Sequence, residues 1–185
     1  MMEQTCTKFE KAMAYHCAPS LVGIKPADLF AWPVMEPQQL EHYRSDLAQR
    51  GICLRCLRQK GKQLLLVYRP ERLKKCLACP VVRRMLADVG YPVDADVDAL
   101  LSHLSVRLGE EDFPHEIGLF LGYPPVDVEG FCRNRGQNYK LCGCWKVYGD
   151  ADAAQRYFDR CNRCRASLCR RIHAGAHLTE LFRAS

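Results

Sequence analysis

The segment from Ile52 to Tyr68 constrains the fold most strongly, because it has the pattern of a β-hairpin. Apolar residues flank the polar stretch 59–62, and Gly61 within that stretch suits a tight turn. The second arm, 64–68, is apolar on both faces. A strand of this kind has to be buried on both sides. The sequence therefore predicts a central strand in a sheet that helices flank.

Further elements are expected from the spacing of apolar residues and from proline and glycine boundaries. Helices are expected at 3–17, 37–50, 81–89, 96–108, 126–132 and 151–174, and strands within 21–30 and at 117–121 and 139–148. The last two strands and the helix between them would form a strand–helix–strand unit over 116–148. The sequence thus predicts a single domain over 1–185, of the α+β or mixed α/β class. Its mixed sheet would have about four or five strands, with a long C-terminal helix packed beside it.

Composition excludes two classes of protein. The chain of 185 residues is 48% hydrophobic, so it can bury a core and is not intrinsically disordered. No run approaches the roughly 18 apolar residues of a membrane-spanning helix. Residues 1–11 mix acids with lysines, which is not the pattern of a secretory signal. We therefore expect a cytoplasmic protein with no membrane partner, whose 12 cysteines are reduced.

Charge is distributed unevenly along the chain. Residues 55–84 and 156–171 are basic, whereas residues 94–129 are acidic. Such asymmetry can mark a nucleic-acid partner, but it is also typical of solvated faces. The isoelectric point of 8.7 is modest, and the basic stretch lacks the spaced aromatic residues that stack on bases. The sequence favours a small molecule over nucleic acid as partner, and it indicates neither a cofactor nor an oligomeric state.

Three Cys-x-x-Cys pairs raise the question of metal or redox chemistry. They are Cys53/Cys56, Cys76/Cys79 and Cys161/Cys164. The first pair would point to opposite faces of a strand. The last pair lies on the apolar stripe of a helix, where free cysteines pack as small hydrophobes. Cys79 is the best redox candidate of the six, because it precedes a helix and follows two lysines, although two ordinary thiols would look the same.

A different cysteine group is the candidate metal site. Cys142 and Cys144 lie two residues apart in an expected strand, so their side chains would share one face. Cys17 could join them from the N-terminal region. The three cysteines are therefore the predicted metal ligands.

Three stretches are unusually specific in sequence. They are HCAPSLVGIKPADLF at 16–30, FPHEIGLFLGYPPVDVEGF at 113–131 and GCWKVYGD at 143–150. Together they resemble a family of uncharacterised bacterial proteins, a domain of unknown function, over about residues 15–181. The resemblance implies no activity, cofactor or catalytic residue. Cys17, Cys144 and Cys164 match the family's pattern, and Asp28 stands where the resemblance leads us to expect Asn.

The middle and last stretches also carry the candidate ligand site. A histidine–glutamate pair and a Gly-Tyr-Pro-Pro turn lie near the ends of the expected strand 117–121, and ligands bind outside strand ends in open α/β sheets. Lysines could supply positive charge there. The candidate binding residues are Lys25, His115, Glu116, Tyr123, Trp145 and Lys146. The alternative is that the aromatic residues of this region only pack the core.

The first function hypothesis is a small-ligand-binding or accessory domain, with a pocket near 113–125 and 143–148. One alternative is a thiol or metal protein that uses the three cysteines named above. Another is an enzyme in which His115 and Glu116 transfer protons, with Cys144 as nucleophile. The sequence contains no nucleophile elbow, phosphate-binding glycine loop or zinc-protease helix.

Overall fold

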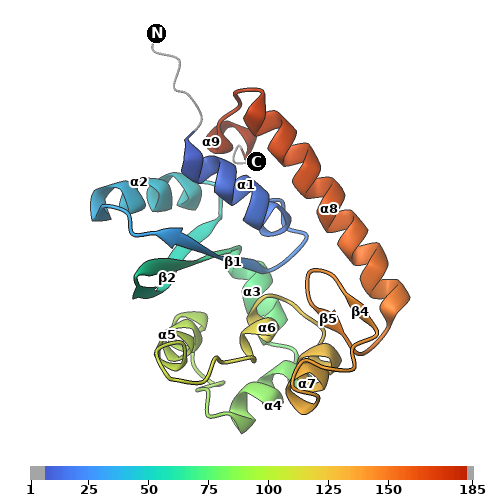
Figure 1. Cartoon of the computed structure of the whole chain (residues 1–185). Helices are drawn as coiled ribbons and strands as arrows, with labels where there is room; N and C mark the ends of the chain where they lie inside the picture. Colours follow the sequence, from blue (N-terminus) through green and yellow to red (C-terminus); the bar gives the residue numbers. More distant parts are fainter. Residues whose placement is uncertain (1–6, 183–185) are drawn as a thin grey trace.

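A three-stranded antiparallel sheet forms the centre of the computed structural model, which describes residues 7–182 (Figure 1). Its strands are β1 (Ala27–Pro33), β2 (Cys53–Lys60) and β3 (Lys62–Tyr68), in the order β1-β3-β2. The predicted hairpin at 52–68 is confirmed as β2 and β3, which turn at Gly61 with a φ of 69°. That positive φ is one that glycine adopts without strain. The predicted central strand is β3.

The alternation of side chains along β3 divides the core into two parts. Leu64, Leu66 and Tyr68 face one core cluster, whereas Leu65 and Val67 face the other. Successive side chains of a strand point to opposite faces, so an uninterrupted apolar run supplies both clusters. The strand that is apolar on both faces is therefore covered on both faces, as the sequence predicts.

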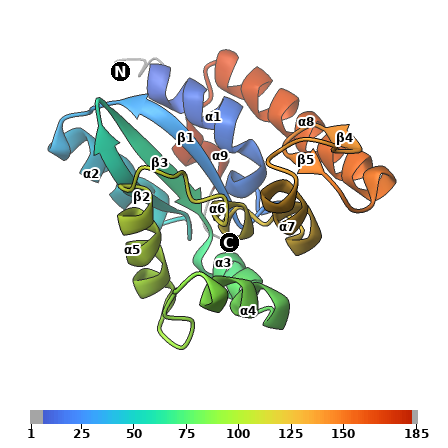
Figure 2. The ribbon, with the colours of Figure 1, turned by 60° about the horizontal axis from the view of Figure 1, so that its bottom comes forward.

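Helices cover the two faces in separate groups (Figures 1 and 2). One face carries α1 (Lys8–Leu21), α2 (Pro37–Ala48), α8 (Ala151–His173) and α9 (Leu178–Leu181). The other carries α3 (Pro70–Leu77), α4 (Pro80–Asp88), α5 (Val97–Arg107), α6 (Ile117–Phe120) and α7 (Pro125–Arg133). Within residues 7–182, no helix has both the length and the apolar character needed to cross a bilayer.

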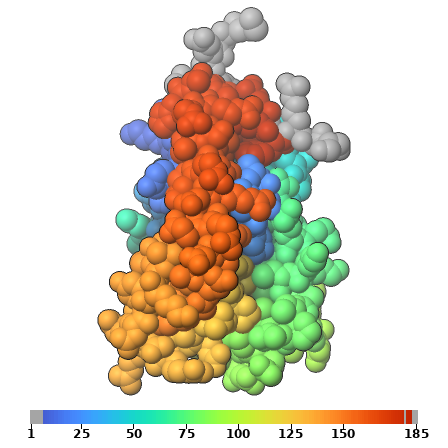
Figure 3. All heavy atoms as spheres, turned by 90° about the vertical axis from the view of Figure 1, so that its right-hand side faces the viewer, coloured from blue at the N-terminus to red at the C-terminus, as the bar shows by residue number. Residues whose placement is uncertain are grey.

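The long C-terminal helix is confirmed as α8, which has 23 residues. Asp150 caps it, because its side chain accepts a hydrogen bond from Ala153 N at 2.9 Å. Figure 3 shows α8 running along one face of the molecule, from the end where α9 lies to the segment around residue 145. The helix packs on α1 along much of its length. One end of α8 therefore lies near the hairpin segment of the candidate ligand site, while the helix also packs on α1.

The strand predicted at 117–121 is wrong, because these residues form the short helix α6. Every residue of Ile117–Phe120 is buried. A short run that is buried all round shows no period, so the sequence pattern does not distinguish a strand from a helix.

The single strand predicted at 139–148 is also wrong. The chain folds back on itself there, and β4 (Leu141–Cys142) pairs antiparallel with β5 (Lys146–Val147). A Cβ atom on Gly143 would lie 2.3 Å from Phe158 of α8, so only glycine allows the turn to approach the helix this closely. The strand–helix–strand unit at 116–148 therefore does not form. Within residues 7–182 both sheets are antiparallel rather than one mixed sheet, which confirms the α+β class.

Candidate functional site

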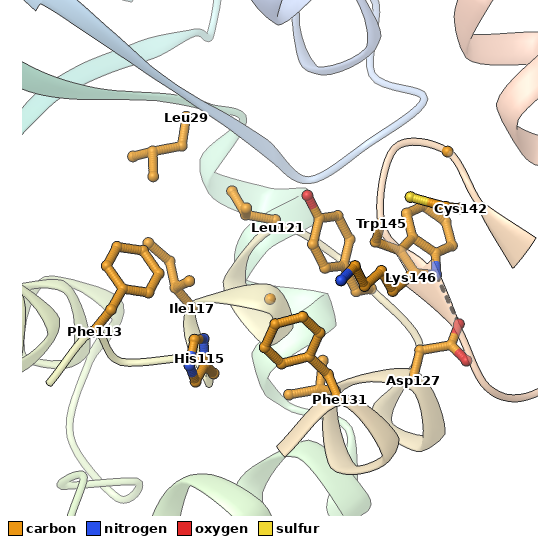
Figure 4. A pocket seen from close by; sticks show the side chains of 14 residues that line it. Leu29, Phe113, His115, Ile117, Leu121, Asp127, Phe131, Cys142, Trp145 and Lys146 are labelled. Carbon is orange, nitrogen blue, oxygen red and sulfur yellow. Dashed lines mark hydrogen bonds between the residues drawn. The ribbon is translucent and has the colours of Figure 1, made fainter. Parts of the chain in front are cut away.

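A cavity of about 330 Å³ opens between the segment 113–131 and the β4–β5 hairpin (Figure 4). Its walls are mostly apolar and come from the loop before α6, from α6, from α7 and from the hairpin, with Leu29 of β1 contributing from the sheet. Four of the six predicted ligand-binding residues line it. They are His115, Tyr123, Trp145 and Lys146.

Asp127 of α7 attaches the hairpin to the rest of the cavity wall. One carboxylate oxygen, Oδ2, accepts a hydrogen bond from Trp145 Nε1 at 2.7 Å. The other, Oδ1, accepts from the backbone N–H groups of Tyr148 at 2.7 Å and Gly149 at 2.8 Å. The Asp127 residue is only 3% exposed. A buried carboxylate that accepts three hydrogen bonds fixes both the hairpin and the indole ring.

Sequence reasoning missed the role of Asp127. An acid in the first turn of a helix is expected there because it complements the helix dipole, and Glu129 two residues later has the same chemistry. Only the fold separates the two residues, because Asp127 faces the hairpin while Glu129 pairs with Arg133 at the surface.

Tyr123 and Trp145 form a stacked aromatic wall. Their ring centroids lie 4.8 Å apart with 28° between the planes. The indole packs edge-on against Phe158 of α8, at 4.6 Å between centroids. The Tyr123 hydroxyl donates a hydrogen bond to the Cys144 carbonyl at 3.3 Å. Both rings are thus held from outside the cavity, so the wall exists without a ligand.

Lys146 places a positive charge beside this wall. Its ammonium donates a hydrogen bond to the Gly136 carbonyl at 2.7 Å and lies 4.9 Å from the Tyr139 ring centroid. Within residues 7–182 no carboxylate forms an ion pair with it. Across the cavity, the exposed His115 ring lies 4.8 Å from the Phe131 ring.

Glu116 and Lys25 do not line the cavity. The Glu116 carboxylate accepts hydrogen bonds from Arg107 Nε at 3.0 Å and from the Tyr91 hydroxyl at 3.1 Å, so it connects α6 to α5. Burial and this carboxylate raise the pKa of Tyr91. Lys25 lies behind the Tyr123 ring, with its ammonium 5.2 Å from the ring centroid. The structure thus separates Glu116 from the cavity that His115 lines.

Lys25 instead forms a buried ion pair with Asp28, at 2.5 Å between Nζ and Oδ1. The other Asp28 oxygen accepts a hydrogen bond from Ser20 N at 2.9 Å. Burial alone would lower the pKa of Lys25, but the Asp28 charge raises it above its usual value. The lysine therefore stays charged inside the protein.

The predicted metal ligands occupy three different environments. Cys142 is exposed and lines the cavity, Cys17 is fully buried in α1, and Cys144 contacts the thiol of Cys161 on α8. In the described part of the chain, no three His, Cys, Asp or Glu side chains are grouped so that they could hold a metal ion. The hairpin explains the separation of Cys142 from Cys144, because Cys142 ends β4 whereas Cys144 lies in the turn before β5, so the two residues do not share a strand face.

Fold and cavity together define an α+β protein with a preformed aromatic cavity and one lysine at its edge. The chain belongs to the family described as "Protein of unknown function (DUF3793)", whose model matches residues 13–182. No curated protein and no solved structure matches the chain. The family match includes every residue of the cavity, so the cavity lies within the part of the chain that defines the family.

Proposed function

We propose that this protein binds a small, flat and largely apolar molecule with one anionic group, in the cavity between 113–131 and the β4–β5 hairpin. The observation that carries the proposal is the position of Lys146, a cation without a carboxylate partner in the described chain, beside the stacked wall of Tyr123 and Trp145. The volume of about 330 Å³ lies at the lower end of the range typical of small-molecule sites.

The aromatic walls favour a flat molecule. Phe131 and Trp145 both line the cavity, and Figure 4 shows the Lys146 side chain extending from the hairpin toward the Phe131 ring. A planar ring between such walls gains roughly 0.5–1.5 kcal/mol per aromatic contact beyond the burial of its area. Because hydrogen bonds and packing already fix Tyr123 and Trp145, binding does not have to order them.

The charges favour an anionic group on the ligand. An ammonium has three N–H donors, and Lys146 uses one of them for the Gly136 carbonyl. His115, an exposed residue that lines the cavity, adds a second polar group. Asp127 is the cavity's carboxylate, but three N–H groups already donate to its two oxygens. An anion could therefore pair with Lys146, whereas a cation would lack a free carboxylate.

Calorimetric titration with two matched probes tests the proposal. The probes are 2-naphthoate, which is flat and anionic, and 2-naphthalenemethanol, which has the same ring system without charge. We expect Lys146→Met to weaken naphthoate binding by roughly 10- to 150-fold, since a charge-assisted hydrogen bond contributes about 1.5–3 kcal/mol. Binding of the neutral probe should not change. Lys140→Met is the matched control, because Lys140 also donates to a backbone carbonyl, that of Gly149 at 2.8 Å, but lies outside the cavity.

Two results would contradict the proposal. One is that neither probe binds to the folded protein. The other is that Lys146→Met and Lys140→Met weaken naphthoate binding equally, which would place the anion at the general surface of the hairpin.

The cytoplasmic location expected from the sequence is part of the same proposal. The 11 cysteines in the described part of the chain are all free thiols, which fits a reducing compartment.

A further inference from the structure

We propose that Cys144 and Cys161 are a peroxide-reactive thiol pair that closes a disulfide between the β4–β5 hairpin and α8. This site lies beside the cavity wall and is independent of the ligand proposed above. Hydrogen peroxide is the oxidant.

The fold brings the two thiols together from distant parts of the chain. Cys144 lies in the turn between β4 and β5 and is half-buried, whereas Cys161 lies on α8 and is fully buried. Gly143 and Trp145, on either side of Cys144, pack on Phe158 and Tyr157 of α8, and Cys161 follows these two residues by one helical turn. The thiol of Cys161 interacts with the sulfur of Cys144 through a side-chain hydrogen bond. A small oxidant can therefore reach Cys144 first, while Cys161 is positioned to react only with its neighbour.

The residues on either side of Cys144 hold it against the helix. Gly143 approaches Phe158 so closely that a Cβ atom would lie 2.3 Å from the ring. Trp145 packs against Phe158 and Tyr157, with centroid distances of 4.6 Å and 5.5 Å. The contact between the two thiols therefore follows from tight packing on both sides of Cys144.

The surrounding charges favour a thiolate at Cys144. The hydrogen bond from the Cys161 thiol lowers the pKa of Cys144 most, and the positive charges of Lys25 and Arg165 lower it further, whereas burial and Asp28 act in the opposite direction. The net result is a pKa of about 6 for Cys144. The same hydrogen bond, together with burial, raises the pKa of Cys161, which keeps its proton.

Other cysteines in the described chain differ in this respect. Burial raises the pKa of six other thiols, whereas the pKa of Cys144 is lowered. The six are Cys17, Cys56, Cys76, Cys132, Cys164 and Cys169. Because the thiolate is the nucleophile, these residues should react more slowly than Cys144.

The proposed chemistry has two steps. The Cys144 thiolate attacks one oxygen of hydrogen peroxide, the O–O bond breaks, hydroxide leaves and Cys144 becomes a sulfenic acid. The sulfur of Cys161 then attacks the Cys144 sulfur, the S–S bond forms and the S–O bond breaks. The hydroxyl group leaves with the Cys161 proton as water. The two sulfurs together lose two electrons, and the peroxide is reduced to one hydroxide and one water.

Peptide mapping of the full chain by mass spectrometry tests this inference. The reduced protein is treated with one equivalent of hydrogen peroxide and then alkylated. We expect a Cys144–Cys161 disulfide as the first product. Cys161→Ser should leave a sulfenic acid at Cys144 that dimedone traps, and Cys144→Ser should leave Cys161 as a thiol.

Cys142→Ser is the matched control, because Cys142 is an exposed cysteine on the same hairpin, two residues from Cys144. This variant should still form the disulfide. The inference is overturned if wild-type protein oxidises first at Cys142 or at Cys79 while Cys144 stays a thiol. If a serine variant fails to fold, as judged by circular dichroism, the map of the wild-type protein decides alone.

Discussion

The substitution Asp127→Asn tests whether the hydrogen bonds of Asp127 hold the β4–β5 hairpin and the Trp145 ring in place. Asparagine keeps the size of the side chain, and its Oδ1 can still accept from the backbone N–H groups of Tyr148 and Gly149. Its amide nitrogen, however, cannot accept the hydrogen bond that Trp145 Nε1 now donates to Oδ2. Two donors would face each other at a buried position.

The expected cost follows from those contacts. Leaving one buried N–H without an acceptor costs about 1–3 kcal/mol. Loss of the negative charge weakens the two remaining hydrogen bonds, since charge-assisted bonds are roughly twice as strong as neutral ones. We expect a total loss of about 2–4 kcal/mol in the free energy of unfolding. Asp127→Ala, which removes all three acceptor contacts, should cost at least as much.

Urea denaturation measures this loss, with Glu129→Gln as the control on the same helix. Glu129 pairs with Arg133 at the surface, where the two side chains are 59% and 72% exposed, so its replacement should cost less than about 0.5 kcal/mol. In a Trp32→Phe background, Trp145 is the sole tryptophan, and its emission should shift to longer wavelength in Asp127→Asn. Equal urea midpoints for the Asp127 and Glu129 variants, with unchanged Trp145 emission, would show that Asp127 does not hold the hairpin and the indole ring in place.

Three further predictions concern buried charges and the thiol pair. Lys25→Met should lower the free energy of unfolding by about 3–5 kcal/mol, because it leaves the Asp28 carboxylate buried without its cation. The double variant Lys25→Met/Asp28→Leu should recover most of this loss. Urea denaturation measures both changes. Burial raises the pKa of Glu10, but hydrogen bonds from Thr7 and Leu178 lower it below its usual value overall. The Glu10 carboxylate therefore adds to the free energy of unfolding above about pH 4.5, and this contribution is lost as the pH falls through the folded-state pKa. In Glu10→Gln, the free energy of unfolding measured by urea denaturation should fall less steeply between about pH 4.5 and lower pH. The rate at which iodoacetamide alkylates Cys144 should rise through about pH 6 and level off by about pH 7, and a rise centred above about pH 8 would contradict the assigned environment.

Local patterns determine the parts of the fold that the sequence predicts. The apolar run of β3 and the turn at Gly61 need no information from elsewhere in the chain, and the hairpin follows from them. Ile117–Phe120 is different, because residues buried on every side have no period by which to recognise a helix. The turn between β4 and β5 depends on the approach of Gly143 to Phe158, a contact with α8 that no local pattern reveals.

The candidate site divides in the same way. The sequence stretches 113–131 and 143–150 predict four ligand-binding residues that the fold brings to one cavity. They are His115, Tyr123, Trp145 and Lys146. Glu116 is adjacent to His115 in sequence, but the turn of α6 directs it toward Arg107 of α5. These placements depend on tertiary packing, which single-sequence reasoning does not contain.

A crystal structure of the protein grown with 2-naphthoate shows whether the cavity is a ligand site. We expect the naphthalene ring between the stacked pair Tyr123/Trp145 and the Phe131 ring, with the carboxylate within hydrogen-bonding distance of Lys146 Nζ. Density for the ligand at another surface, or an empty cavity closed by contact between Phe131 and Trp145, would contradict this expectation.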